Sequence, residues 1–350
     1  MDDPATVALV LSWLPRKELS IMSTAGRAYR RAVYDCSEML VVCGGRGSHG
    51  HVSDCFGLVD GARWVRLASM PEPRAHAAAG ALADNKLLVH GGELQNGQRV
   101  SSTLYYDAIV DAWTPLHHTY QNPEGWEVPM QSDAGYVTLF RELDSTYFYI
   151  VGGLGNTDPT QHVLSFASSK ASLMRTPFIP HTAHHECPLP SARFSCACAQ
   201  LDRDRFYAIG GYEAGRAVRQ VLCYEIYNYR WFNTERNLPE PRFDGAAATL
   251  GGKIYYVGGR DDNFRPRAEV YVYDPHVEQW TSGPPLPEPR GSCRAVVHRG
   301  ELVVVGGTVT TPPRSAPIAL RGGAWTPLPP LPWDGESLLL PAVATMRVRR

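Results

Sequence analysis

The sequence predicts an all-β protein in which six similar sheets are arranged as a propeller, with a short helical segment ahead of them. Six short apolar runs each end in a pair of glycines, and the first glycines of the pairs are spaced by 47, 61, 58, 48 and 48 residues. A tryptophan follows five of these pairs at a distance of 19 to 22 residues. A period of roughly 40 to 50 residues is typical of propeller blades. Six pairs therefore predict six blades.

The glycine pairs and tryptophans mark the framework of the repeat. The glycines are Gly44, Gly45, Gly91, Gly92, Gly152, Gly153, Gly210, Gly211, Gly258, Gly259, Gly306 and Gly307. The tryptophans are Trp64, Trp113, Trp231, Trp280 and Trp325, and we expect them to pack across the boundary between blades. The third unit has no tryptophan, and Met174 or Leu173 is the expected substitute.

The side chains of the remaining segments of each unit predict where each segment lies within a blade. Runs of alanine, glycine and serine, such as 240–250, suit the innermost strand, because blades converge at the axis and leave little room. The apolar run before each glycine pair suits a strand that is covered on both faces. The first such run, 39–45, has no small-residue strand before it, whereas 327–346 contains one after the last tryptophan. We expect this C-terminal strand to complete the first blade and close the ring.

The glycine pairs, the tyrosine-rich strands such as 221–231 and the spaced tryptophans together resemble the kelch repeat. The resemblance covers roughly residues 38–350. It implies a six-bladed kelch β-propeller, closed by the C-terminal strand, as the main domain.

The segment 1–37 has no β pattern. Val7, Val10, Leu11 and Leu14 follow helical spacing, and Pro15 is expected to end that helix. Residues 5–33 resemble an F-box, which implies docking on the Skp1-type adaptor of a cullin ubiquitin ligase. In that role the buried contacts would be Val7, Val10, Leu11, Leu14, Pro15 and Leu19. The alternative is a helical cap that packs on the side of the propeller.

Composition argues against several classes of protein. The net charge is −1, so we expect no nucleic-acid partner that binds through bulk charge. No run approaches 18 apolar residues, and the first residues are acidic, so we expect neither a membrane partner nor a secretory signal. The eight cysteines lack the regularity of a disulfide framework, which favours a reducing compartment, the cytoplasm or the nucleus.

The sequence contains few patterns that indicate catalysis or metal binding. The richest group of metal-ligand types is His181, His184, His185, Glu186 and Cys187, but it lies in a proline-flanked loop with no second ligand group of matched spacing. Cys196 and Cys198 are expected to be small fillers near the axis. No nucleophile elbow, phosphate loop or metalloprotease motif is present. We therefore expect no enzyme activity, metal or cofactor.

Two sets of loops are candidates for binding a partner. The first set follows the glycine pairs, and its richest member, 260–267, contains Arg260, Asp261, Asp262 and Arg265. The second set begins the innermost strands at Arg74, Arg193, Arg242 and Arg290, which either read a ligand or bond a neighbouring carbonyl. The resemblance to kelch adaptors implies that the residues just beyond these arginines line a substrate pocket. By residue matching they are His76, Ser132, Ser195, Asp244 and Ser292.

These observations favour a binding protein. The predicted function is a substrate-recognition adaptor, which holds a protein substrate with the propeller and a ubiquitin-ligase core with the N-terminal helices. The alternative is a kelch scaffold that binds actin or another cytoskeletal or regulatory protein without any ligase role.

Overall fold

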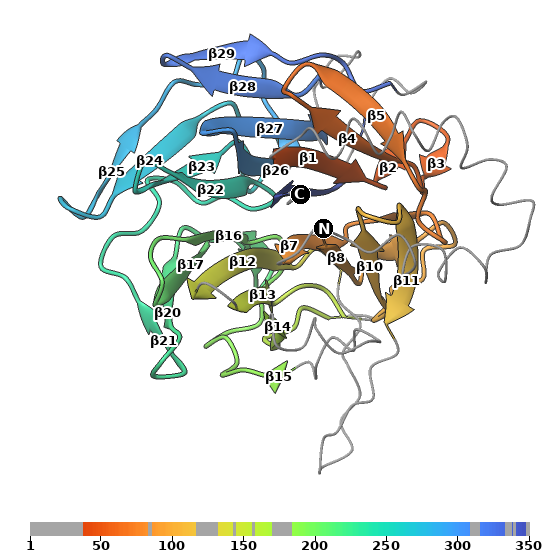
Figure 1. Cartoon of the computed structure of the whole chain (residues 1–350). Helices are drawn as coiled ribbons and strands as arrows, with labels where there is room; N and C mark the ends of the chain where they lie inside the picture. The colour runs from red at the N-terminus through yellow and green to blue at the C-terminus, as the bar shows by residue number, and fades with distance from the viewer. Residues whose placement is uncertain are drawn as a thin grey trace, which may run out of the picture.

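The computed structural model describes residues 38–82, 86–116, 132–142, 145–155, 158–169, 184–308, 316–332, 338 and 341–347. These residues form six four-stranded sheets around one axis, with three additional two-stranded ribbons (Figure 1). The predicted all-β, six-bladed architecture is confirmed. The expected N-terminal helices and the substitute Met174 or Leu173 lie outside the described residues.

Each blade has the same order of strands from the axis outward. Blade 1 consists of β30 (Ala342–Arg347), β1 (Glu38–Cys43), β4 (Cys55–Val59) and β5 (Arg63–Leu67). Blade 2 consists of β7 (Ala78–Leu82), β8 (Lys86–His90), β10 (Thr103–Asp107) and β11 (Ala112–Leu116). Blade 3 consists of β12 (Gly135–Glu142), β13 (Ser145–Val151), β14 (Val163–Ser169) and β15 (His184–His185).

The second half of the ring repeats this order. Blade 4 consists of β16 (Ala197–Gln200), β17 (Arg205–Ile209), β20 (Val221–Glu225) and β21 (Arg230–Asn233). Blade 5 consists of β22 (Ala246–Leu250), β23 (Lys253–Val257), β24 (Val270–Asp274) and β25 (Gln279–Ser282). Blade 6 consists of β26 (Gly291–His298), β27 (Glu301–Thr308), β28 (Ile318–Arg321) and β29 (Ala324–Pro327).

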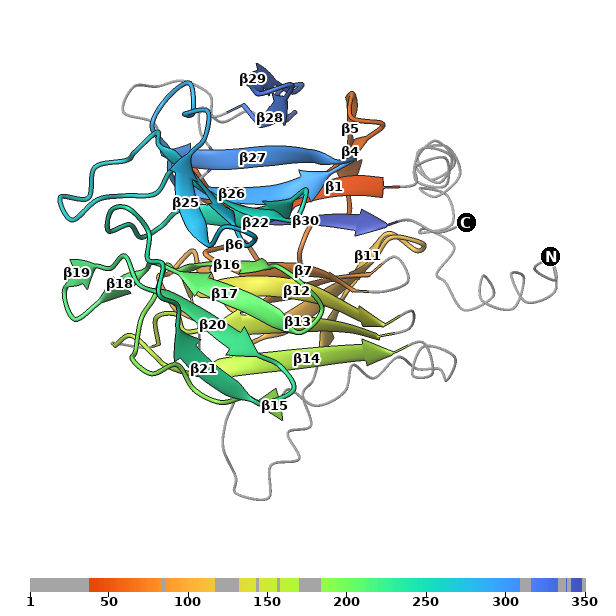
Figure 2. The ribbon, with the colours of Figure 1, turned by 90° about the vertical axis from the view of Figure 1, so that its left-hand side faces the viewer.

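Blade 1 joins strands from the two ends of the described chain. The innermost strand β30 pairs antiparallel with β1 from Glu38 opposite Arg347 to Cys43 opposite Ala342. The two strands run side by side in Figure 2. This pairing leaves β1 with a neighbour on both edges, since β4 pairs with its other side.

The apolar core lies between the blades. Successive residues of a strand point to opposite faces of its sheet. In β1, Leu40 and Val42 pack toward blade 6, while Met39 and Val41 pack toward blade 2. The buried apolar residues of the described chain accordingly separate into six clusters, one for each boundary between neighbouring blades.

Each of the five repeat tryptophans fastens its blade to the preceding one. The indole N–H of Trp231 donates to the Cys187 carbonyl of blade 3 over 2.9 Å, and its ring lies 4.9 Å from Tyr224. Trp64 of blade 1 donates to the Pro329 carbonyl beyond blade 6 over 2.8 Å, so the contact continues across the point where the chain closes the ring. The same bond is made by Trp113, Trp280 and Trp325.

The glycine pairs are the points where one blade meets the next through its backbone. The N–H of Gly259 donates to the Arg290 carbonyl of blade 6 over 2.8 Å. Gly258 has φ of +63°, and a Cβ at this position would lie 2.4 Å from the same carbonyl. Only glycine combines this conformation with such a close approach. Equivalent contacts are made by Gly44 and Gly45, Gly152 and Gly153, Gly210 and Gly211, and Gly306 and Gly307.

Deletion of residues 335–350 should open the ring. The shortened chain loses β30, its six-residue pairing with β1, and the buried side chains of Val343 and Met346 at the two faces of blade 1. We expect a large drop in melting temperature, and a less cooperative transition, in a thermal melt followed by circular dichroism. A chain that ends at Arg347 is the control and should melt like the intact protein. Equal melting of the 335–350 deletion and the intact chain would refute closure by β30.

Candidate functional site at one end of the axis

The four turn arginines belong to the framework of the propeller. Arg74, Arg193, Arg242 and Arg290 are at most 2% exposed. The guanidinium of Arg290 donates to the Gly306 carbonyl of its own blade over 3.1 Å, and the Arg290 carbonyl accepts the Gly259 N–H of the preceding blade. Arg74 and Arg193 make the same two contacts, so each of these three arginines links the glycine pair of its own blade to that of the preceding blade. Of the two readings offered by the sequence, the structure supports the bond to a neighbouring carbonyl.

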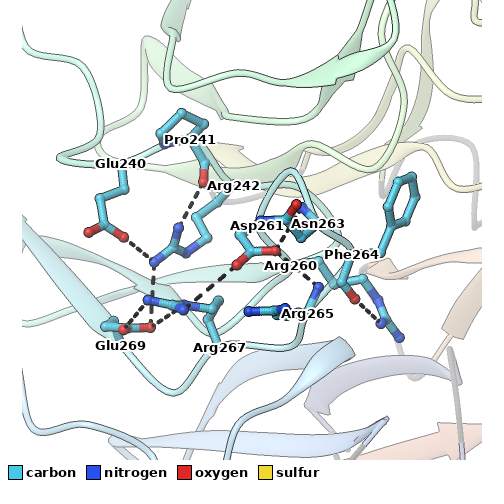
Figure 3. A network of polar contacts seen from close by, with 10 residues as sticks. All are labelled: Glu240, Pro241, Arg242, Arg260, Asp261, Asn263, Phe264, Arg265, Arg267 and Glu269. Atoms are coloured by element: carbon cyan, nitrogen blue, oxygen red, sulfur yellow. Dashed lines mark hydrogen bonds and ion pairs between the residues drawn. The ribbon is translucent and has the colours of Figure 1, made fainter.

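Arg242 makes a variant of this arrangement (Figure 3). Its guanidinium donates to the Pro241 carbonyl over 2.9 Å and forms ion pairs with Glu240 and, at 3.5 Å, with Glu269. Glu269 also pairs with Arg267 over 2.9 Å. These side chains hold the base of the 260–267 loop.

Two residues beyond each turn arginine, and at Asp133 in blade 3, the described backbone of blades 2 to 6 is linked by hydrogen bonds around the axis, an arrangement that we call the ring. His76, Asp133, Ser195, Asp244 and Ser292 all have φ between +51° and +61°. The N–H of each of the last four donates to the carbonyl of the residue before it in this series, over 3.2, 2.7, 2.9 and 2.8 Å. We call these five residues, together with the loop 260–267, the mouth.

One of the predicted pocket residues, Ser132, lies beside the ring and not in it. Ser132 lies one position before the ring, where it forms a bridge with Leu154 and receives a hydrogen bond from Arg99 Nε over 3.0 Å. Asp133 occupies the ring position in blade 3. The third unit lacks the turn arginine from which the other positions were counted, so the count ended one residue early. Counting back two residues from Gly135, the start of β12, would have found it.

The ring carries two pairs of oppositely charged groups. His76 Nδ1 contacts Asp133 Oδ1, and the two side chains are 19% and 16% exposed. Arg260 Nε contacts Asp244 Oδ2 at 3.0 Å, and Ser292 Oγ donates to the same oxygen. Burial raises the pKa of Asp244, and the nearby Asp133 carboxylate adds to this, against the Ser292 hydrogen bond and Arg260. Hence both loop sets predicted from the sequence meet at one end of the axis.

The 260–267 loop is folded by its own side chains. Asp261 Oδ1 accepts the N–H groups of Asn263 and Arg265 over 2.9 and 3.0 Å (Figure 3). Asp262 Oδ1 accepts the Ala217 N–H of blade 4 over 2.6 Å. Asp261 and Asp262 therefore shape the loop and hold it against its neighbour, whereas the side chain of Arg265 is exposed on the rim.

An aromatic cluster beside this loop was not predicted from the sequence. The Phe264 ring lies 5.3 Å from Phe243 and 5.7 Å from Tyr212, and Phe194 lies 5.3 Å from Tyr212. Phe264 is 55% exposed, although its neighbour Phe243 is buried. These rings come from loops of blades 4 and 5 that are distant in sequence, so no local pattern indicates that they meet.

Beneath the ring, the inner strands surround an axial cavity of about 310 Å³. Alanine and glycine supply most of its wall, and Arg294 is the only charged side chain among the described lining residues. The Arg294 guanidinium lies 5.8 Å from the centre of the Tyr136 ring and donates to the Cys293 carbonyl over 3.1 Å. The positively charged Arg294 guanidinium is therefore part of the wall of the cavity below the mouth.

The described residues contain no group of three histidine, cysteine or acidic side chains that could hold a metal ion. Glu186, from the metal-like sequence cluster, instead accepts hydrogen bonds from Ser165 Oγ over 2.5 Å and from Tyr224 Oη over 2.8 Å. His181 and the side chains of His184 and His185 lie outside the described part of the chain. Within that part, no helix is long and apolar enough to cross a bilayer.

Comparison with known proteins agrees with this geometry. The domain family described as "KLHDC2/KLHL20/DRC7 Kelch-repeats domain" matches residues 127–307, which is more than half of the chain. The chain belongs to the kelch-repeat family. Kelch propellers are mostly binding or adaptor modules.

Similar kelch proteins come from distant organisms. Kelch-like protein terF of Aspergillus terreus is 29% identical over 298 residues, which cover 81% of this chain and 60% of that protein. Kelch repeat protein M-T8 of Myxoma virus is 35% identical over 141 residues, which cover 39% of this chain and 27% of that protein. Kelch-like protein 36 of Rattus norvegicus is 24% identical over 294 residues, which cover 79% of this chain and 44% of that protein. The chain thus spans less than two thirds of the length of each of these kelch relatives.

Substitution of His76 by glutamine should destabilise the kelch propeller in a pH-dependent way. Burial lowers the pKa of His76, but Asp133 outweighs it and raises that pKa above its ordinary 6.5. The pKa of Asp133, which burial alone would raise, is held below its ordinary 3.8 by His76 and then by Arg294 and Arg99. The stabilisation is therefore fully present from about pH 4 to about pH 6.5, and it is lost as the pH rises through the raised pKa of His76.

The measurement is urea unfolding of the native chain and His76→Gln at pH 5 and pH 9. We expect the difference in unfolding free energy to be larger at pH 5. His49→Gln, at an exposed histidine, is the control and should show no such dependence. A His76→Gln difference of equal size at both pH values would contradict the ion pair.

Proposed function

We propose that this kelch protein is a substrate-recognition adaptor, which binds a protein substrate at the mouth and a Skp1-type ubiquitin-ligase component through residues 1–37. The observation that carries the proposal is the composition of the mouth. Loops of several blades meet there, and they present a ring of histidine, aspartate and serine side chains, an exposed arginine and an aromatic cluster within one region. Aromatic and arginine side chains are the types that contribute most of the binding energy at protein interfaces.

At the mouth, the residues that support the fold differ from the residues that are available to contact a partner. The turn arginines and glycine pairs are buried and bonded within the propeller. Phe264 and Arg265, in contrast, present exposed side chains on a loop that Asp261 and Asp262 keep in place. A rigid loop loses little conformational freedom when a partner binds. Phe264 is therefore our candidate for the main contact with the substrate.

The two ends of the axis would serve different partners. The second strand of each blade runs toward the mouth, so β1 begins at Glu38 on the opposite face. The chain enters the first blade on that face, at Glu38. We propose that a partner of residues 1–37 and a partner of the mouth bind at the same time. Holding both at once raises the effective concentration of the substrate at the ligase, and no catalytic group of this chain is needed.

The experiment combines two variants of the full chain. Leu11→Asp with Leu14→Asp places charges on the apolar helical positions, so it should abolish capture of a purified Skp1-type adaptor and leave substrate capture unchanged. Phe264→Ala with Arg265→Ala removes the exposed mouth contacts, so it should retain the adaptor and lose captured proteins, as measured by quantitative affinity-capture mass spectrometry.

Val277→Ala is the control for the mouth, because this exposed side chain lies in an outer hairpin on the opposite face. This substitution should leave the capture of both the adaptor and the substrate proteins unchanged. Failure of the intact chain to bind the adaptor would refute the ligase role while leaving a kelch scaffold that binds through its mouth. An unchanged set of captured proteins in the Phe264 and Arg265 variant would refute the mouth as the binding site.

A further inference from the structure

Two cysteine sulfurs converge between blades 3 and 4. Cys198 lies in β16 and Cys196 directly precedes that strand, and both face β12 of the neighbouring blade. A Cβ placed on Gly135 would lie 2.6 Å from Cys198 Sγ and 2.8 Å from Cys196 Sγ. The two sulfurs therefore share the space that Gly135 leaves open, and their separation cannot exceed the sum of these two distances.

At the other boundaries between described blades, the equivalent positions do not combine two cysteines with a glycine on the facing strand. Cys293 occupies the position equivalent to Cys196 in blade 6, and its sulfur contacts the Val257 carbonyl at 3.9 Å, as Cys196 Sγ contacts Val151 at 3.8 Å. The position equivalent to Cys198 is Ala295 in blade 6. The position equivalent to Gly135 on the facing strand is Ala246, whose Cβ fills the space. The second sulfur and the missing side chain occur together at blades 3 and 4.

We propose that Cys196 and Cys198 form a two-coordinate binding site for Cu(I), a soft monovalent cation. Thiolate ligands select such ions over hard cations. Zinc in structural sites takes four ligands, and no third histidine, cysteine or acidic side chain joins the two cysteines among the described residues.

A bridging ion suits this geometry better than a disulfide does. Residues i and i+2 of an extended strand have Cα atoms roughly 6.6–6.8 Å apart. That is at the outer limit of the range of about 4.4–6.8 Å found in disulfides. The strand therefore opposes a direct S–S bond, whereas an ion between the sulfurs adds the missing length.

The site can be reached from the axial cavity, and binding is balanced by the release of protons. Both cysteines line the axial cavity, and Cys196 directly follows the ring residue Ser195. Binding breaks two S–H bonds and forms two S–Cu bonds, and the two protons pass to solvent. The Cys198 hydrogen bond lowers the pKa of Cys196, with the Arg193 guanidinium acting in the same direction, while burial raises the pKa of Cys198 well above its ordinary value. The ion therefore displaces the protons of both sulfurs, as is general for thiolate ligands.

The test is a titration of the full chain with Cu(I) under anaerobic, reducing conditions, in competition with the colorimetric chelator bathocuproine. We expect the native chain to retain one equivalent and Cys198→Ala to retain none. Alanine should be tolerated, because Ala79, Ala247 and Ala295 occupy the equivalent positions in other blades. Cys293→Ala is the matched control and should retain the full equivalent.

X-ray absorption of the loaded native chain provides a second readout that needs no variant, and it should show two sulfur neighbours and no nitrogen. Melting followed by circular dichroism checks the fold of each variant, and Cys196→Ala serves if Cys198→Ala does not fold. Absence of retained copper in the native chain, full retention by folded Cys198→Ala or Cys196→Ala, or loss of copper in Cys293→Ala would each overturn the assignment.

Discussion

The rest of the structure depends on the close backbone contact between each glycine pair and the strand that begins the next blade. At this joint the second glycine donates its N–H to the carbonyl of the following turn, and the first glycine leaves no Cβ in the way. The contact fixes where the second strand of one blade lies relative to the innermost strand of the next. Because it recurs around the ring, it sets both the spacing of the blades and the width of the axial cavity.

The same joint determines which residues remain available for recognition. Three of the four turn arginines bind glycine carbonyls and Arg242 binds the Pro241 carbonyl, and the burial of all four leaves no room for a ligand at the guanidinium. Two residues later the chain reaches the ring, where the backbone is again bonded between blades but the side chains differ from one blade to the next. Fixed backbone and variable side chain at one position is the condition under which a propeller can change its partner and keep its fold.

Much of the fold could be predicted from the sequence because the repeat is expressed in residue types with strict local requirements. Glycine pairs, alanine-rich strands and spaced tryptophans indicate their places in a blade without any knowledge of the neighbouring blades. The mouth was predicted less completely. Asp133 was missed because its unit lacks the usual arginine, and the Phe264 cluster was missed because its rings come from separate loops. The convergence of Cys196 and Cys198 depends on a glycine in another blade, and no spacing along one strand can indicate it.

The most direct measurement of the joint compares Gly258→Ala with Gly251→Ala by urea unfolding. Both glycines have φ near +60°, but Gly251 lies in an open turn with nothing within 4 Å, whereas a Cβ on Gly258 would meet the Arg290 carbonyl. The account predicts a modest loss of unfolding free energy for Gly251→Ala, about 1 kcal/mol for the backbone conformation alone. Gly258→Ala should cost about 1–3 kcal/mol more, because the contact between blades must open. Equal losses in the two variants would contradict the claim that this contact holds the ring together.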